Sequence, residues 1–452
     1  MPAWTSHWLR DVRLLLASQL LVVVTTTALA ILLARSLGPS DWGLFSALLG
    51  LSQALSTFVN LGMGTWLLRE LARLQDEGAT PERRYSESSR RIIGGVIASA
   101  TFGIVLLSGA IVVLALIRTE IETAIALVGL IVYTVFVVVA NCMEALLRAE
   151  RRLKTVVAAT LLERFLVLAL AGTAVQLDSG IWALGLAHTF AGFARLSFVG
   201  YTIFVKRRFP IVVPAFQHIR RFVLNGVPFA FNTVALQVIP RLDTLVVLSM
   251  SATAAGFFAL GDRILGPALI VPWVASAALY PFLAREAPRS KAALRISVGM
   301  FGLGLTLAIA GALIAPYIVP TVFGGSYGDA VIVVQVMLLA TPFVYASNPL
   351  IAHLYTSGKE RSVFAITILA SVLGTAFVVG GQVSFGVTGA GVGYVLRQLL
   401  FTLALAGIAL VQQSRAAEDA LQDTSVVPLL GTPDDATSST SPSAFRAPGS
   451  SH

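Results

Sequence analysis

The sequence predicts an all-α polytopic membrane protein with 12 transmembrane helices. Hydrophobic residues make up 56% of the chain and charged residues only 12%, whereas a soluble domain carries roughly one-quarter charged residues. Apolar runs of about 20 residues, each long enough to cross a bilayer, recur from one end of the chain to the other. A soluble protein would not repeat such runs a dozen times.

The apolar runs give the position of each predicted helix. The expected helices cover 14–34, 41–68, 92–117, 121–147, 155–176, 180–205, 222–250, 254–284, 296–320, 330–356, 362–382 and 387–412. The first run contains Ala28-Leu29-Ala30, which is similar to a signal-peptidase site, but the apolar stretch continues past it. We therefore expect an uncleaved membrane anchor.

The basic loops predict the orientation of the chain. With both termini in the cytosol, the inside loops 69–91, 148–154, 206–221 and 285–295 are rich in Lys and Arg. The outside loops then hold only Arg35 and Arg118. The positive-inside rule therefore predicts both termini on the cytosolic side of the cytoplasmic (inner) membrane. We expect these basic loops to contact membrane lipids and not to bind nucleic acid.

The predicted helices fall into two halves. We expect a cytosolic N-terminal segment at 1–13, a six-helix bundle at 14–205, a basic cytosolic linker at 206–221 and a second bundle at 222–412. Residues 413–452 are rich in Ser, Thr, Pro, Asp and Gly and should form a disordered cytosolic tail. Residues 43–48 are similar to 256–260, and 141–147 to 348–354, both offset by about 210 residues. The common offset favours two bundles related by a parallel repeat, an architecture of alternating-access transporters.

Ionisable residues occur inside the predicted membrane helices. Each charge at the bilayer centre costs roughly 2.5–3.5 kcal/mol on insertion scales. Such residues persist if they pair, line water or bind a charged ligand, and an excess of arginine over acid favours an anionic ligand. The residues are Arg164, Arg195, Arg241, Arg263, Arg397, Glu144, Glu163, Asp243 and Asp262.

Hairpin geometry predicts two buried ion pairs between neighbouring helices. The chain should turn near residue 252, which places Asp243 and Arg263 at almost equal depth. A turn near 178 does the same for Glu163 and Arg195. The Asp243–Arg263 pair could equally well stabilise the fold or act in the transport cavity. For the Glu163–Arg195 pair the structural role is favoured.

The remaining arginines are the candidates for substrate contact. Glu144 and Arg148 are four residues apart and should form a structural bridge. Arg164, Arg241 and Arg397 then lack an obvious acidic partner. The planar guanidinium binds phosphate oxygens bidentately, and we place Arg241 first among these candidates. Arg164 and Arg397 could instead bond to Asp262 or to backbone carbonyls.

A polar face on the second helix adds two candidates. Gln53, Ser56, Thr57 and Asn60 recur at helical spacing, and they could either bond neighbouring helices or form a cavity wall that touches sugar. The candidate substrate-binding residues are thus Arg241, Arg263, Arg164, Arg397, Arg195, Gln53 and Asn60. The candidate coupling or gating residues are Asp243, Asp262 and Glu163.

The sequence offers no pattern for catalysis or for a cofactor. Cys142 is the single cysteine and lies in a predicted helix, so no disulfide framework exists. Five histidines are scattered without metal-ligand spacing, and no loop carries a cluster of catalytic residues. We therefore expect neither a metal, nor a cofactor, nor an enzyme such as a membrane glycan ligase or polymerase.

Several motifs, in order along 30–380, resemble those of one transporter family. Residues 35–45, RSLGPSDWGLF, are similar to the turn A-R-x-L-G-P-x-x-Y-G-x-F of polysaccharide flippases. Residues 61–62 and 69–73 resemble the end of that family's second helix, and 323–327, FGGSY, its F-G-x-x-Y turn. Arg241-Leu242-Asp243 and 256–263, GFFALGDR, resemble its helix 7–8 hairpin.

The resemblance is to the lipid-linked oligosaccharide and polysaccharide flippases of the MOP superfamily. It implies a MATE-like fold, with two bundles in a V around a central cavity. It also implies movement of an undecaprenyl-diphosphate-linked glycan from the inner to the outer leaflet, near a polysaccharide polymerase or glycosyltransferases. Trp42 replaces the family's usual Tyr, Phe257-Phe258 replaces a Tyr-containing pair, and Asp262 is an additional acid. The alternative, a MATE-like exporter of organic cations, would require acids in excess of bases.

Overall fold

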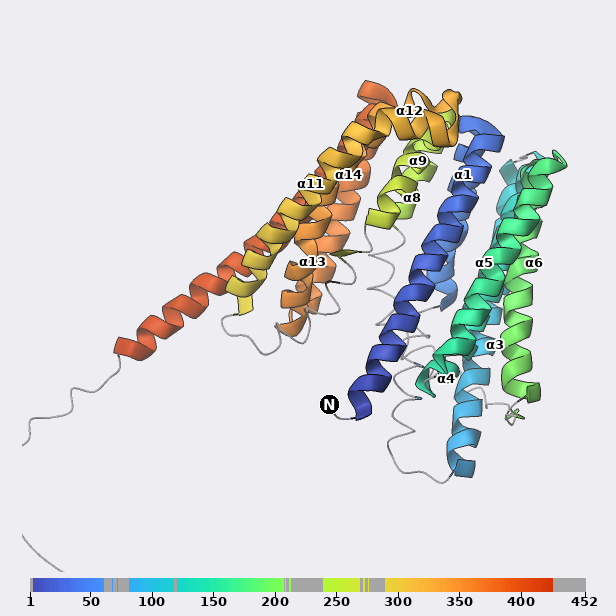
Figure 1. The fold of residues 1–452 in the computed structure, drawn as a ribbon, viewed down its shortest axis with the longest axis horizontal. Helices are drawn as coiled ribbons and strands as arrows, with labels where there is room; N and C mark the ends of the chain where they lie inside the picture. Colours follow the sequence, from blue (N-terminus) through green and yellow to red (C-terminus); the bar gives the residue numbers. More distant parts are fainter. Residues whose placement is uncertain are drawn as a thin grey trace, which may run out of the picture.

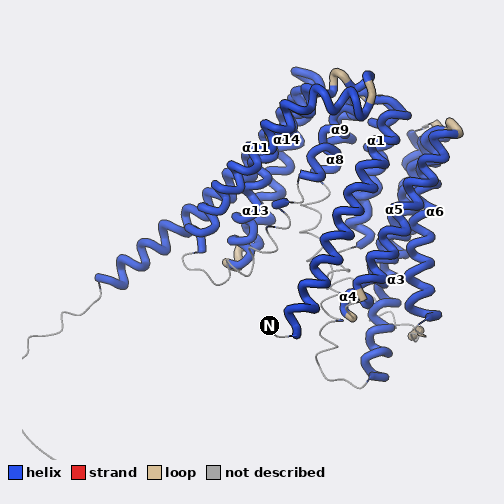
Figure 2. Tube along the Cα trace, viewed as in Figure 1, coloured by secondary structure: helices blue, strands red, loops and turns tan. Residues whose placement is uncertain are grey.

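The computed structural model describes residues 3–60, 67, 71, 81–117, 120–150, 152–206, 208, 211–212, 239–268, 271–272, 275 and 289–425. Every regular element in these residues is a helix, which confirms the all-α class (Figure 2). Seven helical stretches in this part of the chain are long and apolar enough to cross a membrane. Two of the seven contain a kink that joins two predicted helices, and the total of 12 remains a prediction.

The first set of helices follows the predicted ranges except at two starts, where the first helix begins at Ala3 rather than 14 and the third at Pro81 rather than 92. At Gly38, whose φ is 73°, the first helix reverses direction and joins the predicted helices 14–34 and 41–68. Glycine adopts this backbone conformation without a steric penalty. The set comprises α1 (Ala3–Asn60), α3 (Pro81–Ile117), α4 (Ile121–Ala149), α5 (Leu153–Gln176), α6 (Gly180–Gly200) and the short η1 (Tyr201–Lys206).

The second set differs from prediction in two places. The expected helix 330–356 is interrupted between Leu338 and Thr341, where Pro342 removes a backbone donor. The last helix turns at Phe385–Gly386 and continues to Ser425, so the start of the expected disordered tail is helical. The set comprises α8 (Ile239–Met250), α9 (Ala252–Ala268), α11 (Arg289–Phe323), η2 (Gly325–Tyr327), α12 (Ala330–Leu338), α13 (Thr341–Thr356) and α14 (Glu360–Ser425).

Other predicted segments lie outside the described residues. They are 61–66 at the end of the second expected helix, 69–70 and 72–80 of the expected loop 69–91, most of the linker 206–221, residues 222–238 and 276–288, and the tail beyond 425.

The helices form two bundles that meet along α1. Helices α3 to α6 pack with α1, and α8 to α14 pack among themselves, while α1 also contacts α8, α9 and α11 of the second bundle. The bundles converge at the end that carries α12 and the turn of α1, and they diverge toward the end that carries the N-terminus (Figure 1). The arrangement is a V that is closed at one end.

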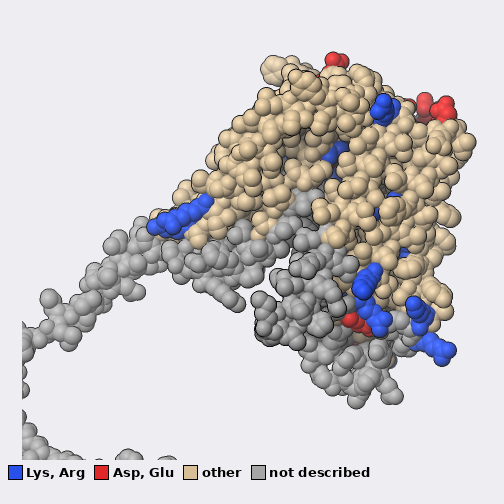
Figure 3. Space-filling view, viewed as in Figure 1, with Lys and Arg blue, Asp and Glu red and all other residues tan. Residues whose placement is uncertain are grey.

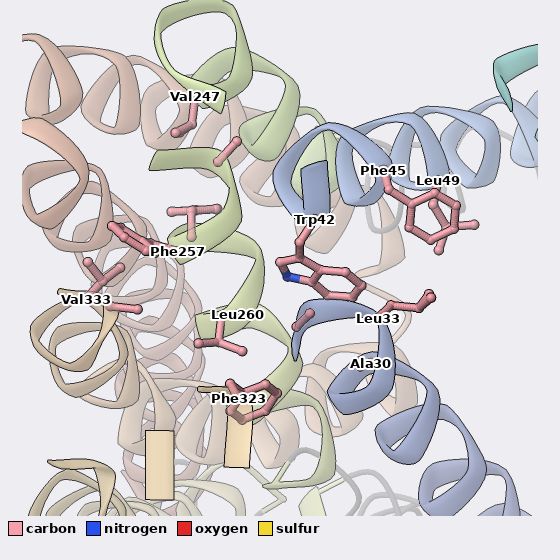
Figure 4. Packing of buried hydrophobic residues seen from close by; sticks show 14 of the residues in the cluster. Ala30, Leu33, Trp42, Phe45, Leu49, Val247, Phe257, Leu260, Phe323 and Val333 are labelled. Carbon is pink, nitrogen blue, oxygen red and sulfur yellow. The ribbon is translucent and has the colours of Figure 1, made fainter. Parts of the chain in front are cut away.

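An apolar cluster spans both bundles at the closed end. Trp42 of α1 lies in one cluster with Leu260 of α9 and Phe323 of α11 (Figure 4). The hydroxyl of Tyr327 in η2 donates a hydrogen bond of 2.9 Å to the carbonyl oxygen of Ala34 in α1. These contacts join the first bundle to the second.

Two glycines let the backbones of the two bundles touch there. A Cβ atom on Gly43 of α1 would collide with the carbonyl oxygen of Ala252 in α9. A Cβ atom on Gly256 would collide in the same way with the carbonyl oxygen of Pro39. A larger residue at either glycine would therefore force the closed end apart.

Charged side chains on the visible face lie mainly toward the two ends of the molecule, with few between them (Figure 3). This distribution fits a chain that crosses a membrane.

Candidate functional site

Arg195 of α6 is the centre of a buried network in the first bundle. Its guanidinium donates to Glu163 Oε2 of α5 at 2.5 Å, to Glu144 Oε1 of α4 at 2.9 Å and to Asn141 Oδ1 at 2.8 Å. Tyr133 donates its hydroxyl proton to the other oxygen of Glu163, at 2.6 Å. The predicted Glu163–Arg195 pair is confirmed, and all three guanidinium nitrogens of Arg195 have acceptors.

The network explains how the first bundle holds charge inside the membrane. The side chains of Glu144 and Glu163 are fully buried and that of Arg195 is 6% exposed. Glu144 also accepts a bond from Arg148 at 3.1 Å, which confirms the predicted bridge. Arg195, a candidate substrate ligand by sequence, is instead fully occupied by the protein.

Asp243 of α8 pairs with Arg397 of α14 rather than with Arg263, so the predicted Asp243–Arg263 pair is wrong. The carboxylate accepts bonds from the Arg397 guanidinium and, at 3.1 Å, from the hydroxyl of Thr375. The guanidinium carbon of Arg397 lies 4.8 Å from the centroid of the Tyr394 ring. Asp243 faces α14 inside the second bundle. Counting residues from the hairpin turn gives the depth of a side chain in the membrane, but not the direction in which its helix points it.

Arg397 is correspondingly a structural residue. Its side chain is only 3% exposed, and it runs so close to Gly374 that a Cβ atom there would collide with it. The expectation that Arg397 lacks an acidic partner is therefore wrong.

Arg241 of α8 reaches across the interface between the bundles. Its guanidinium donates to the side-chain oxygen of Gln53 in α1. Asp262 precedes Arg263 in α9, but it is exposed and forms no ion pair among the described residues. Arg241 lines neither of the cavities that follow, although Gln53 lines the first.

The first cavity is small and lies at the apex of the V. Its volume is about 30 Å³, which is room for a water molecule or two. Its walls come from α1, α4, α5, α6 and α9, and no acidic residue lines it. The polar residues in the wall are Thr26, Gln53, Tyr133, Arg164, His188 and Arg263.

The wall of this cavity carries hydrogen-bond donors without acceptors. Trp42 Nε1 and Arg164 Nε are buried and have no partner in the part of the chain that the structure describes. The carboxylate nearest to Arg164 is Glu163, at 3.9 Å, and both its oxygens already accept shorter bonds from other donors. Arg263 has no ion pair within the described ranges. A buried donor without an acceptor costs about 1–3 kcal/mol, so the cavity favours an anion.

Three wall residues were not identified from sequence. His188 bonds the carbonyl oxygen of Leu184 through Nδ1 at 2.8 Å, and its ring lies 5.3 Å from that of Tyr133. Trp42 lines the cavity with its Nε1 unpaired among the described residues, and Tyr133 lines it while its hydroxyl donates to Glu163. The only sequence feature that could have pointed to the cavity wall is the replacement of the family's tyrosine by Trp42. Aromatic residues in apolar helices are otherwise interpreted as part of the core.

A larger groove adjoins the cavity. It has a volume of about 530 Å³, lies between α1, α9 and α11, and is mostly apolar, with Asp262 at its wall. Thr26, Ala30 and Arg263 line both spaces, so Arg263 stands where they meet. Asn60, at the end of α1, lines neither.

Comparison with known proteins agrees with this architecture. Residues 8–287 match the family described as polysaccharide biosynthesis protein. The fold is similar to an inward-facing multidrug resistance MATE family transporter of the MOP superfamily, with 17% identity, a TM-score of 0.73 and coverage of 90% of this chain and 96% of that one. It is also similar to the lipid II flippase MurJ in an inward closed conformation, with 11% identity, a TM-score of 0.70 and coverage of 93% of both chains.

A third structure shares the fold at lower similarity. It is a MOP superfamily transporter from Pyrococcus furiosus, with 17% identity, a TM-score of 0.57 and coverage of 89% of this chain and 95% of that one. No curated protein matches the chain. The fold is thus that of the MATE-type and MurJ structures. The family match covers more than half of the sequence, and the chain therefore belongs to the polysaccharide biosynthesis protein family.

Proposed function

We propose that this protein is a membrane transporter, a flippase that moves an undecaprenyl-diphosphate-linked glycan precursor from the inner to the outer leaflet of the cytoplasmic membrane. Arg263 binds the diphosphate from the adjoining groove, and Arg164 joins it once the bundles move apart and enlarge the small cavity between them. The glycan then feeds cell-surface polysaccharide biosynthesis. The observation that carries the proposal is the acid-free cavity at the apex of the V, which is lined by two arginines.

The charge of the cavity favours a diphosphate. Arg164 and Arg263 supply two positive charges, and the unsatisfied nitrogens of Arg164 and Trp42 supply further donors. Hydrogen bonds between ionised groups are roughly twice as strong as neutral ones. An exporter of organic cations would instead need an acid in this wall, so the geometry disfavours that alternative.

The adjoining groove suits the lipid part of such a substrate. Residues such as Ile264, Ile318 and Val322 make most of its surface apolar, while Arg263 stands at its inner end. A polyprenyl chain could lie in the groove while its diphosphate reaches Arg263. Asp262, which lines the same groove, would compete with the phosphate for the arginines and so limit how tightly the substrate is held.

Alternating access would use the interface of α1 with α8 and α9. The bundles touch backbone to backbone at Gly43 and Gly256, and Arg241 bridges them through Gln53. Opening of this end must break the Arg241–Gln53 and Tyr327–Ala34 bonds. We place Arg241 in the gate, one side chain away from the phosphate.

Deletion of the gene in its own host tests the function. The proposal predicts loss of a surface glycan together with accumulation of its lipid-linked precursor on the cytosolic side of the membrane. Both defects should be restored by the wild-type gene and not by one that carries Arg263→Gln. Because Arg263 has no ion-pair partner in the described structure, its replacement strands no buried carboxylate.

Membrane abundance of the variant, measured alongside, separates a transport defect from loss of the protein. A deletion strain with normal surface glycans and no precursor accumulation would refute the proposal.

A further inference from the structure

A third cavity lies entirely within the first bundle. It has a volume of about 320 Å³ and runs between α1 and α5, which pack against each other. It shares no lining residue with the two spaces at the apex. It is therefore separate from the route proposed for the transported lipid.

The lining of this groove is amphipathic. One wall is apolar and includes Val22, Leu153, Val157 and Leu161. Ser18, Gln19, Thr160 and Arg148 make the rest polar. Such a lining matches a molecule with an acyl chain at one end and a polar head group at the other.

The polar end of the groove is positively charged. The Arg148 side chain is 44% exposed and, among the described residues, pairs only with Glu144, through Nη2. Arg152 and Lys154, on either side of the lining residue Leu153, are also exposed, and Arg152 forms an ion pair with Glu150 at 3.6 Å. Lys and Arg side chains gather at this end of the first bundle (Figure 3).

We propose that this groove, formed by residues 18–22, 148 and 153–161, binds an anionic phospholipid of the surrounding leaflet. Arg148 contacts the phosphate, with Arg152 and Lys154 adding to the local positive potential, and one acyl chain lies along Val157 and Leu161. Basic pockets between transmembrane helices are suited to anionic head groups, and each basic residue near such a surface contributes about 1 kcal/mol.

Binding of phosphatidylglycerol and phosphatidylcholine with identical acyl chains to the purified full chain tests this proposal. Native mass spectrometry in detergent gives the affinity for each lipid. Phosphatidylglycerol should bind more tightly than phosphatidylcholine. Arg148→Gln should weaken the affinity for phosphatidylglycerol about five-fold and leave the affinity for phosphatidylcholine unchanged. Glu144 keeps its 2.9 Å bond to Arg195 in this variant, so the buried carboxylate retains a partner.

Two further variants separate charge from shape. Val157→Phe fills the groove but retains its charge, and it should also weaken phosphatidylglycerol binding. Arg361→Gln removes an exposed arginine at the start of α14 in the other bundle, and it should have no effect.

Unchanged phosphatidylglycerol binding by both Arg148→Gln and Val157→Phe would overturn the proposal. Loss of binding of undecaprenyl diphosphate, but not of phosphatidylglycerol, in Arg148→Gln would also overturn it, because the groove would then belong to the transported lipid.

Discussion

Replacing Asp243 by alanine leaves the guanidinium of Arg397 inside the second bundle without a counter-charge. The Arg397 side chain is 3% exposed and that of Asp243 is fully buried, so water cannot take the place of the carboxylate. Removal of one partner of a buried ion pair typically costs about 3–5 kcal/mol. Asp243 also accepts a bond from Thr375, and we therefore expect a loss of about 4 kcal/mol in the free energy of unfolding.

The native cysteine provides the assay. Cys142 is fully buried, so a thiol-reactive fluorophore labels it only when the protein unfolds in detergent. A double-mutant cycle with Asp243→Ala, Arg397→Met and the double variant isolates the pairwise energy. Glu87→Ala and Arg91→Ala give a matched control, because that pair is four residues apart on α3 and its side chains are 32% and 21% exposed, and it should contribute only about 0.3–0.5 kcal/mol.

The double variant should be more stable than the sum of the single losses predicts, because the charged partner is no longer stranded. A coupling energy below about 1 kcal/mol, within the range of exposed pairs, would refute the assignment of Asp243 to Arg397.

Other changes test the gate, the network of the first bundle and the topology. Gly256→Ala should force the closed end apart and reduce transport, whereas Gly299→Ala in α11, whose Cβ meets open space, should not, as measured by surface glycan at equal abundance. Arg195→Met removes the close ion-pair partner of the buried Glu163, while Glu144 keeps its bond to Arg148. It should lower the free energy of unfolding by at least about 3 kcal/mol; a loss below about 1 kcal/mol would contradict the network. In a cysteine-free background, an impermeant reagent applied to intact cells should label Leu177→Cys and not Lys359→Cys, and the reverse pattern would invert the topology.

Local geometry made part of the site predictable from sequence. Glu163 and Arg195 lie on helices joined by a short turn, so counting residues from that turn placed them at equal depth, and the structure confirms their pairing at 2.5 Å. Glu144 and Arg148 follow from helical spacing alone. The helix positions follow from the length of each apolar run.

Rotation of a helix about its own axis was not predictable in the same way. Asp243 turns toward Arg397, 154 residues along the chain, and no local pattern shows that α14 packs against α8. The role of Arg164 likewise depends on the cavity between several helices, because its neighbour Glu163 is already occupied. The break before Pro342 was readable from sequence, but the apolar run across it favoured a single helix.

The most direct test is the affinity of the purified protein for undecaprenyl diphosphate. A hydrogen bond to a charged group contributes about 1.5–3 kcal/mol, so Arg263→Gln and Arg164→Gln should each weaken binding about ten-fold or more. Arg241→Ala, which acts through Gln53, should have a smaller effect, and Arg361→Gln should have none. A double variant of Arg164 and Arg263 that binds undecaprenyl diphosphate as tightly as the wild type would contradict the proposed diphosphate site.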